Sequence, residues 1–117
     1  MGPNREDVAM TGPAREIDVQ VHADHQIPAA DRDYARHKVT QAIRRTRRPV
    51  LYVRVDLHQD HNPSQTRPAQ AKALVDLNGT PVEAHGSAPT LHEAIDLLED
   101  RLVHRLEHAR VGRAPRR

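Results

Sequence analysis

Arginine is the residue type with the clearest chemical potential in this chain. Four arginines fall within five positions at the end of a helix expected at about residues 29–46: Arg44, Arg45, Arg47 and Arg48. A guanidinium group pairs with two phosphate oxygens at once, so the cluster suits a phosphate-bearing partner. Acidic residues begin this helix and cations end it, so the helix dipole offers a purely structural alternative for part of the run. Arg36 and Lys38 add positive charge to the same helix.

A second basic surface is predicted on the last helix, expected at about residues 91–109. At 100° per residue its apolar side chains form one buried stripe: Leu91, Ile95, Leu98, Leu102, Leu106 and Ala109. The charged residues separate by sign onto the two flanks of that stripe: Arg101, His104, Arg105 and His108 against Asp96, Glu99, Asp100 and Glu107. The separation favours a basic edge directed at a partner. The alternative is a solvated helix with ordinary i,i+4 pairs, such as Asp100 with His104.

Metal binding and covalent catalysis find little support. His104 and His108 are four residues apart on the last predicted helix, and His58 and His61 are close in sequence, whereas a zinc site needs three or four ligands. The chain has no Cys and no His-Glu-x-x-His motif, and Ser64 and Ser87 fall in expected loops without a nucleophile motif. We therefore expect no metal, no cofactor, no small-molecule substrate and no enzymatic activity.

The composition indicates a single small domain with an aliphatic core. The chain has 117 residues, no Phe or Trp, and a net charge of +2 when its nine His are neutral. No apolar run approaches the length of a membrane span and no signal segment is evident, so we expect a cytoplasmic protein that does not bind membranes. Tyr34 and Tyr52 are the only aromatic residues of the stacking kind besides His, so RNA would be bound by shape and backbone charge.

Hydrophobic periodicity predicts four strands and two helices. The strands are expected at 17–21, 50–58, 69–77 and 80–85, with a polar, proline-bounded loop at 59–68 that we expect to be mobile. In the second strand, alternation assigns four residues to the inward face: Leu51, Val53, Val55 and Leu57. Tyr52, Arg54 and Asp56 then lie on the opposite face, open to solvent or to a partner.

Two local motifs precede the last helix. Asn78-Gly79, between two alternating runs, predicts a hairpin with a type I′ turn, because both residues tolerate positive φ. Thr90 and Glu93 form a capping box, in which each side chain is expected to satisfy a backbone N–H, and Pro89 prevents an earlier helix start.

The element order β-α-β-β-β-α predicts an α/β two-layer sandwich with a mostly antiparallel four-stranded sheet and both helices on one face. Residues 1–14 lack periodicity and are expected to form a disordered lead. Residues 15–109 form the predicted domain, and residues 110–117 form a basic tail or the start of a linker.

From about Ile17 to Ala109 the chain resembles the family of ribosome hibernation-promoting factors and ribosome-associated inhibitors, formerly called sigma-54 modulation proteins. The resemblance is densest at 75–79, at 82–84 and in the string Ala94-Ile-Asp-Leu-Leu-Glu-Asp-Arg-Leu102. It is weaker at 34–39 and 50–57. The last string, after a strand–Asn-Gly–strand unit, is fairly specific to the family.

This resemblance implies a domain similar to double-stranded-RNA-binding domains. Such domains occupy the decoding channel of the small ribosomal subunit and silence translation during stress or stationary phase. Lys38 and Arg101 fall on basic positions of the family, and His104, Arg105 and His108 fall where relatives are often basic or polar. With the arginines derived from the residues alone, the predicted RNA-binding set comprises Arg36, Lys38, Arg44, Arg45, Arg47, Arg48, Arg101, His104, Arg105 and His108.

Two departures from the family pattern stand out. Asp31 replaces a usually apolar residue, so we expect the first helix to begin late or to pack loosely. Histidines replace more firmly charged residues on the last helix, which would make affinity depend on pH.

The family's long form adds a dimerisation domain. We expect this chain to be a short form, or the N-terminal part of a long form, and to be a monomer that does not pair ribosomes.

Two other functions remain open beside binding to the small subunit and its ribosomal RNA. A general RNA-binding or RNA-chaperone module would bind duplex RNA as well as it binds ribosomes. A protein-interaction domain would use the exposed face of the sheet and would need no RNA.

Overall fold

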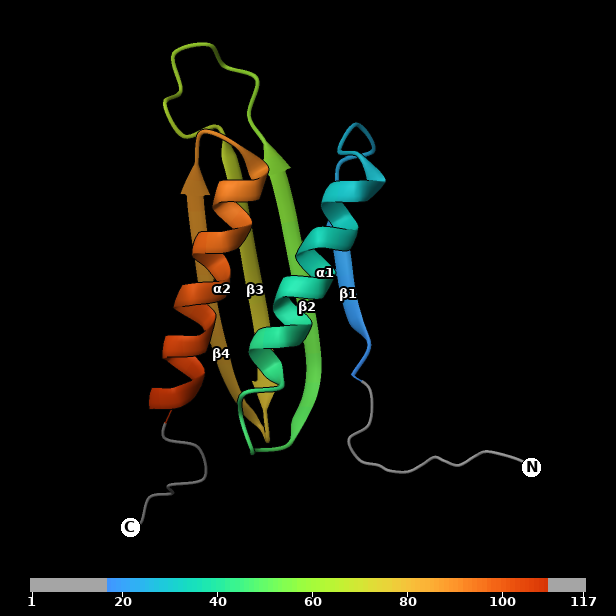
Figure 1. Ribbon diagram of the computed structural model, residues 1–117, viewed down its shortest axis with the longest axis vertical. Helices are drawn as coiled ribbons and strands as arrows, with labels where there is room; N and C mark the ends of the chain where they lie inside the picture. Colours follow the sequence, from blue (N-terminus) through green and yellow to red (C-terminus); the bar gives the residue numbers. More distant parts are fainter. Residues whose placement is uncertain (1–16, 110–117) are drawn as a thin grey trace, which may run out of the picture.

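The computed structural model describes residues 17–109 and has the predicted element order. The strands are β1 (Val19–Ala23), β2 (Val50–Gln59), β3 (Ala69–Leu77) and β4 (Thr80–Ala88). The helices are α1 (Ala29–Ile43) and α2 (Leu91–His108) (Figure 1). The predicted N-terminal lead, residues 1–14, and the predicted tail, residues 110–117, lie outside the described residues.

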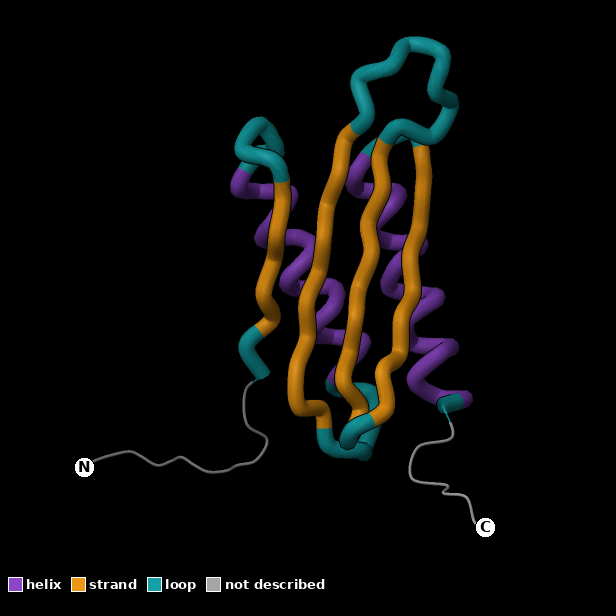
Figure 2. The backbone as a smooth tube through the Cα atoms, turned by 180° about the vertical axis from the view of Figure 1, so that it is seen from behind, coloured by secondary structure: helices purple, strands orange, loops and turns teal. Residues whose placement is uncertain are grey.

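The four strands form one sheet in the order β1-β2-β3-β4. β1 is parallel to β2, with Val21 opposite Val55, whereas β2–β3 and β3–β4 are antiparallel. A parallel pair needs a crossover connection, and α1 provides it. Views from opposite sides show both helices against one face of the sheet (Figures 1 and 2). The predicted two-layer α/β sandwich is confirmed.

The core between the two layers is aliphatic, as a chain without Phe or Trp requires. On β3, an interior strand, the inward positions are small near one end and larger near the other: Ala69, Ala71, Ala73, Val75 and Leu77. Residues of α2 cover the sheet: Leu91, Ala94, Ile95, Leu98, Leu102 and Leu106. Residues of α1 complete the layer: Ala35, Val39, Ala42 and Ile43. Small side chains on the sheet allow the helices to approach closely.

One close approach of α2 to the sheet is at Gly86 on β4. A Cβ atom at this position would lie 2.7 Å from the carbonyl oxygen of Ala94 and 3.0 Å from the amide nitrogen of Leu98. Both atoms belong to the backbone of α2, which cannot rotate away as a side chain can. Gly86 therefore sets the distance between α2 and the sheet.

The predicted hairpin is confirmed, and the capping box is confirmed in part. Asn78 and Gly79 have φ angles of 55° and 94°, and the side chain of Asp76 accepts a hydrogen bond from the Gly79 N–H at 2.7 Å. The Thr90 hydroxyl oxygen accepts from the Glu93 N–H at 3.2 Å. The Glu93 carboxylate accepts from the Thr90 hydroxyl at 3.1 Å, so only one of the two predicted backbone contacts forms.

The prediction that Leu51 faces the core is wrong. Val50 pairs with Leu77 and Tyr52 pairs with Asp76, so Leu51 is the extra residue of a bulge and is 63% exposed. A bulge changes which face the following residues occupy relative to the preceding ones. The other three inward residues of the predicted alternation are buried: Val53, Val55 and Leu57.

Several predicted boundaries shift. β1 lies two residues further along than predicted, and β4 extends to Ala88, so Ser87 lies in a strand and not in a loop. α1 begins at Ala29, so the expected late start is wrong: the Asp31 carboxylate lies 3.9 Å from His92 of α2, where an acid is tolerated. The loop after β2 is closed by a hydrogen bond from the Asp60 N–H to the Pro68 carbonyl at 2.8 Å.

We predict that Gly86→Ala destabilises the domain by about 1–3 kcal/mol, because the added methyl group overpacks the contact with α2. Urea denaturation followed by circular dichroism measures the change. Ser87→Ala, on the next residue of the same strand, should change the free energy of unfolding by less than about 0.5 kcal/mol. Equal effects of the two substitutions would contradict the close-approach interpretation.

Candidate nucleic-acid interface

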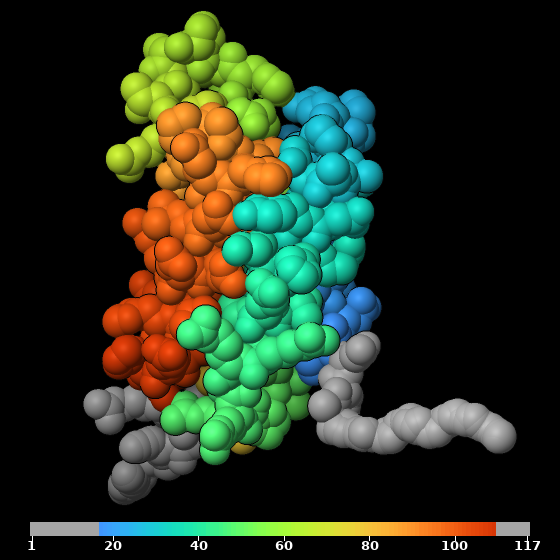
Figure 3. Space-filling model, viewed as in Figure 1, coloured from blue at the N-terminus to red at the C-terminus, as the bar shows by residue number. Residues whose placement is uncertain are grey.

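The parallel arrangement of the two helices determines where the predicted basic residues lie. α1 and α2 both run from the end of the sheet that carries the β2–β3 loop to the opposite end, so their C-terminal ends are neighbours (Figure 1). The α1–β2 connection, residues 44–49, lies at that end beside the last turns of α2. In the space-filling view, side chains of this connection reach towards the C-terminal part of α2 (Figure 3).

The arginine run lies beyond α1 and not inside it. α1 ends at Ile43, Arg44 is its C-cap residue, and the last turn of the helix contains no basic residue. The interpretation of the run as cations in the last turn of α1 is therefore wrong. Within residues 17–109, no carboxylate lies within 4.0 Å of the guanidinium groups of Arg44, Arg45 or Arg47, and all three residues are exposed.

Arg48 has a structural contact that sequence spacing could not suggest. Its guanidinium group donates a hydrogen bond to the carbonyl oxygen of Ala109, the C-cap residue of α2. The partial negative charge at a helix C-terminus makes this a favourable place for a cation. Arg48 therefore stabilises the end of the other helix and ties the α1–β2 connection to it.

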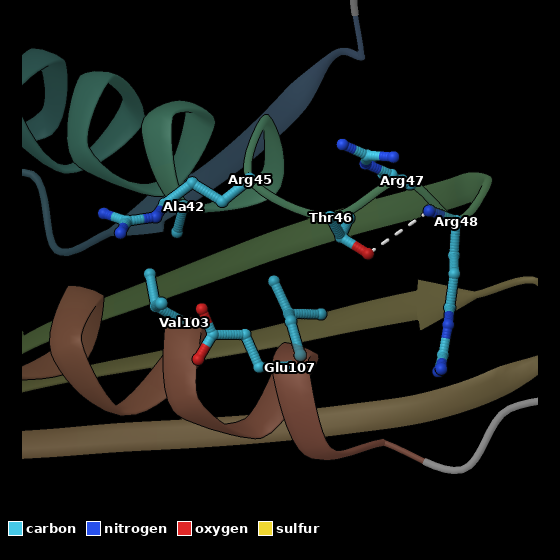
Figure 4. Close-up of a pocket in the computed structure, with 8 residues that line it drawn as sticks. Ala42, Arg45, Thr46, Arg47, Arg48, Val103 and Glu107 are labelled. Carbon is cyan, nitrogen blue, oxygen red and sulfur yellow. Dashed lines mark hydrogen bonds between the residues drawn. The ribbon is translucent and has the colours of Figure 1, made fainter.

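A hollow of about 240 Å³ lies between the connection and α2 (Figure 4). One side is apolar, formed by Ala42, Val103 and Leu106, and the connection contributes arginine side chains to the other. Glu107 of α2 also borders the hollow. Sequence reasoning did not identify Val103, Glu107 or Thr46 as site residues, because only the folded connection brings them together.

The basic flank of α2 faces away from α1, above β4. Arg101 donates to the His85 carbonyl of β4 at 3.0 Å, and Arg105 is exposed. The rings of His104 and His108 lie 4.3 Å apart, and His108 Nδ1 lies 2.8 Å from the His104 carbonyl oxygen. The predicted segregation of charge on α2 therefore corresponds to two different surroundings, and the basic side is the outward one.

Asp96 and Glu99, on the acidic flank of α2, face Tyr34 and Lys38 of α1 across a polar seam. The Lys38 ammonium group lies 2.8 Å from Glu99 and 3.8 Å from Asp96. The Tyr34 hydroxyl donates a hydrogen bond to Asp96, and the Tyr34 ring stacks on His92 at 4.0 Å. Lys38, predicted to bind RNA, is only 23% exposed and is already paired with carboxylates.

Arg36 lies apart from the other predicted RNA-binding residues, on the β1 side of α1. Its guanidinium group is 3.2 Å from Asp33 and its Nε is 3.5 Å from the Val19 carbonyl oxygen of β1. The structure thus divides the predicted set into the connection (Arg44, Arg45, Arg47 and Arg48), the outer flank of α2 (Arg101, His104, Arg105 and His108), the seam (Lys38) and the β1 side (Arg36).

Two further features of the described residues concern possible metal ligands and long apolar helices. In the described part of the chain, no three His, Asp or Glu side chains converge in a way that could hold a metal ion. Between residues 17 and 109, no helix is long and apolar enough to cross a membrane.

The chain is thus a two-layer α/β sandwich whose helix layer carries cations on its outer side. A family model described as sigma 54 modulation protein / S30EA ribosomal protein matches residues 17–111, and the chain belongs to this family. Among curated proteins, no sequence matches.

The solved structures that are similar to the chain include the following two. The crystal structure of the Thermus thermophilus Protein Y N-terminal domain is 26% identical and has a TM-score of 0.61. The match covers 80% of this chain and 97% of that one. A ribosomal subunit interface protein from Coxiella burnetii is 19% identical with a TM-score of 0.54, covering 76% and 92% of the two chains, and supports the fold alone.

The seam predicts a loss of stability at alkaline pH. The pKa of Tyr34 is raised above 10.0, chiefly by the hydrogen bond to Asp96, and the pKa of Lys38 is raised above 10.5, chiefly by the hydrogen bond to Glu99. A raised pKa stabilises the fold below the unfolded-state pKa, and this contribution is lost as the pH rises through the folded-state value. Urea denaturation between about pH 8 and about pH 12 covers the ordinary pKa values of Tyr and Lys. The free energy of unfolding should fall above about pH 10.

The double variant Tyr34→Phe/Lys38→Met should lose less stability than the wild type over the same alkaline range. Tyr52→Phe is the matched control, since it removes a hydroxyl group from the uncovered face of the sheet. An alkaline loss of equal size in the seam variant and the wild type would contradict the role of the seam.

We predict that Arg48→Met lowers the free energy of unfolding by about 1 kcal/mol, because the Ala109 carbonyl loses a charged donor. Arg47→Met removes the same charge from the neighbouring position and should change stability by less than about 0.5 kcal/mol. Thermal melting of the two variants side by side measures the difference. Identical melting temperatures would exclude the capping role of Arg48.

Proposed function

We propose that the chain is a ribosome-binding factor that occupies the decoding channel of the small subunit and silences translation under stress or in stationary phase. Membership of the sigma 54 modulation / S30EA ribosomal protein family carries this proposal. In the channel, the domain would exclude messenger and transfer RNA by occupying their place. It would act in the cytoplasm by binding, without catalysing a reaction.

The distribution of charge supports an interaction of the helix layer with ribosomal RNA. The acidic residues Asp96 and Glu99 are turned towards α1, where Lys38 pairs with both. Arg101 and Arg105 lie on the opposite flank of α2, away from these two acids, and both are exposed. Such an arrangement presents positive charge outward from a domain whose net charge is small.

The proposed recognition is of RNA backbone and shape. The chain contains no Phe or Trp and only two Tyr. Tyr34 is stacked on His92 in the seam, and Tyr52 lies on the uncovered face of the sheet. Bases are usually read by stacking on aromatic side chains, so phosphate contacts from arginines are the more suitable mode for the helix layer.

Sedimentation through a sucrose gradient tests the proposal. We expect the purified protein to move with small ribosomal subunits, to move poorly with large subunits, and to bind them more tightly than it binds an RNA duplex of about 20 base pairs, which is long enough for a duplex-binding domain. Equal affinity for the duplex would favour a general RNA-binding module. No affinity for either RNA would favour a protein-interaction domain.

We predict that Arg101→Glu/Arg105→Glu weakens binding to the small subunit by about tenfold or more, since two phosphate contacts become repulsive. If about four to six cations contact phosphates, the dissociation constant should rise with salt with a log–log slope of roughly 3 to 5. The slope should fall in the variant.

Arg54→Glu/Lys72→Glu is the matched control for this experiment. It makes the same change in net charge on the uncovered face of the sheet, where Arg54 pairs with Asp56 at 3.0 Å and Lys72 pairs with Glu83 at 3.1 Å. Exposed pairs of this kind contribute little to stability. If the two double variants weakened binding equally, net charge and not the helix layer would be responsible.

A further inference from the structure

We propose that the hollow between the α1–β2 connection and α2 is a binding site for one nucleotide, with guanine as the preferred base. The nucleotide supplies a phosphate group, a ring with flat apolar faces and N–H donors at its edge. It can come from two sources, an unstacked nucleotide of ribosomal RNA or a free nucleoside monophosphate. The first source rests on the proposed function, whereas the second does not.

The arginines of the connection supply the phosphate partners. Arg48 is held by the Ala109 carbonyl, and it offsets the partial negative charge at the end of α2. Arg45 and Arg47 lie on either side of Thr46 and, among residues 17–109, have no carboxylate partner (Figure 4). The two side chains extend in different directions from the connection (Figure 4), so each guanidinium group, on its flexible stem, offers a separate partner for a phosphate group at the rim of the hollow.

The opposite side of the hollow suits a flat ring. Val103 is half-buried and supplies the accessible apolar surface, whereas Ala42 and Leu106, at 0% and 3% exposure, contribute almost none. The hollow measures about 240 Å³, which is below the range of about 300–1,000 Å³ typical of complete ligand pockets and is suited to part of a ligand. A base lying on Val103 would bury part of one face and leave the other accessible.

Glu107 argues against a site for a bare anion. Its side chain comes from α2 and faces the arginine side of the hollow together with Val103 (Figure 4). A carboxylate repels a phosphate ion but accepts hydrogen bonds from the N–H groups of a base, as acidic side chains do in base recognition. Guanine presents two such N–H groups side by side on its pairing edge, and a carboxylate accepts both. A nucleotide places its phosphate and its donor edge at separate positions, and here the arginines come from the connection whereas Glu107 comes from α2.

Equilibrium binding of free 5′-GMP to the full chain, measured by ligand-observed NMR, provides the first test. We expect binding at millimolar concentration, weaker binding of 5′-UMP and 5′-AMP, and weaker binding still of inorganic phosphate. Arg45→Gln/Arg47→Gln should weaken GMP binding by about tenfold or more, as expected for the loss of a charge-assisted pair of contacts. Arg54→Gln/Lys72→Gln, which removes two cations from the sheet face, should leave GMP binding unchanged.

The substitution Val103→Phe tests whether GMP binds inside the hollow or is only attracted by the positive charge around it. The larger side chain fills the hollow and leaves every charge in place, so it should abolish GMP binding, whereas Val103→Ile should reduce it less. A thermal melt establishes that the variant is folded. If Val103→Phe fails to fold, the arginine variant and Glu107→Gln still test the site, because Glu107→Gln should weaken the preference for GMP over AMP and strengthen binding of inorganic phosphate.

Ribosome binding by the same variants identifies the source of the nucleotide. If Val103→Phe weakens binding to the small subunit severalfold, the site takes a nucleotide of ribosomal RNA. If it abolishes GMP binding and leaves ribosome affinity unchanged, or if the wild-type chain binds GMP but not ribosomes, the ligand is a free nucleotide. If no GMP binds up to about 10 mM, a concentration that detects even very weak sites, and Val103→Phe binds ribosomes as the wild type does, the nucleotide site is excluded while ribosome binding stands.

Discussion

The close packing of α2 against the sheet is the contact on which the rest of this structure depends. The core has no aromatic side chain, so its volume is filled only if the layers come close together, at Ala-lined positions of β3 and at Gly86 of β4. This packing fixes the rotation of α2 about its own axis. Once Leu98 and Leu102 are buried, Glu99 must face α1 and Arg101 must face β4.

The rotation of α2 gives its two flanks different roles. Acids on the inner flank are used within the molecule, because they hold Lys38 and Tyr34 of α1 and keep the two helices side by side. Cations on the outer flank have only backbone carbonyl groups as described partners, as with Arg101 and His85. A domain of small net charge can thereby present a basic surface, because Asp96 and Glu99 lie on the side of α2 that faces α1.

Periodicity and turn chemistry were enough to predict the element order, the sheet with both helices on one face and most of the core, because each depends on neighbouring residues. The exposure of Leu51 was not predictable in this way, because a bulge depends on pairing with β3. The contacts of Arg48 and Lys38 join residues far apart in sequence, and the ion pairs of Lys38 and the hydrogen bond of Arg48 appear only once α1 and α2 lie together. The sequence therefore identified the cationic residues. It could not show which of them make contacts within the fold and which remain available to a partner.

The orientation of the domain on the ribosome is tested most directly by a tethered hydroxyl-radical probe. The chain has no Cys, so a single cysteine can carry the probe at Gln41, exposed on α1, or at Gln70, exposed on the opposite face of the sheet. We predict strong cleavage of small-subunit RNA from position 41 and weak cleavage from position 70. Stronger cleavage from position 70, or equal cleavage from both, would contradict an RNA-facing helix layer.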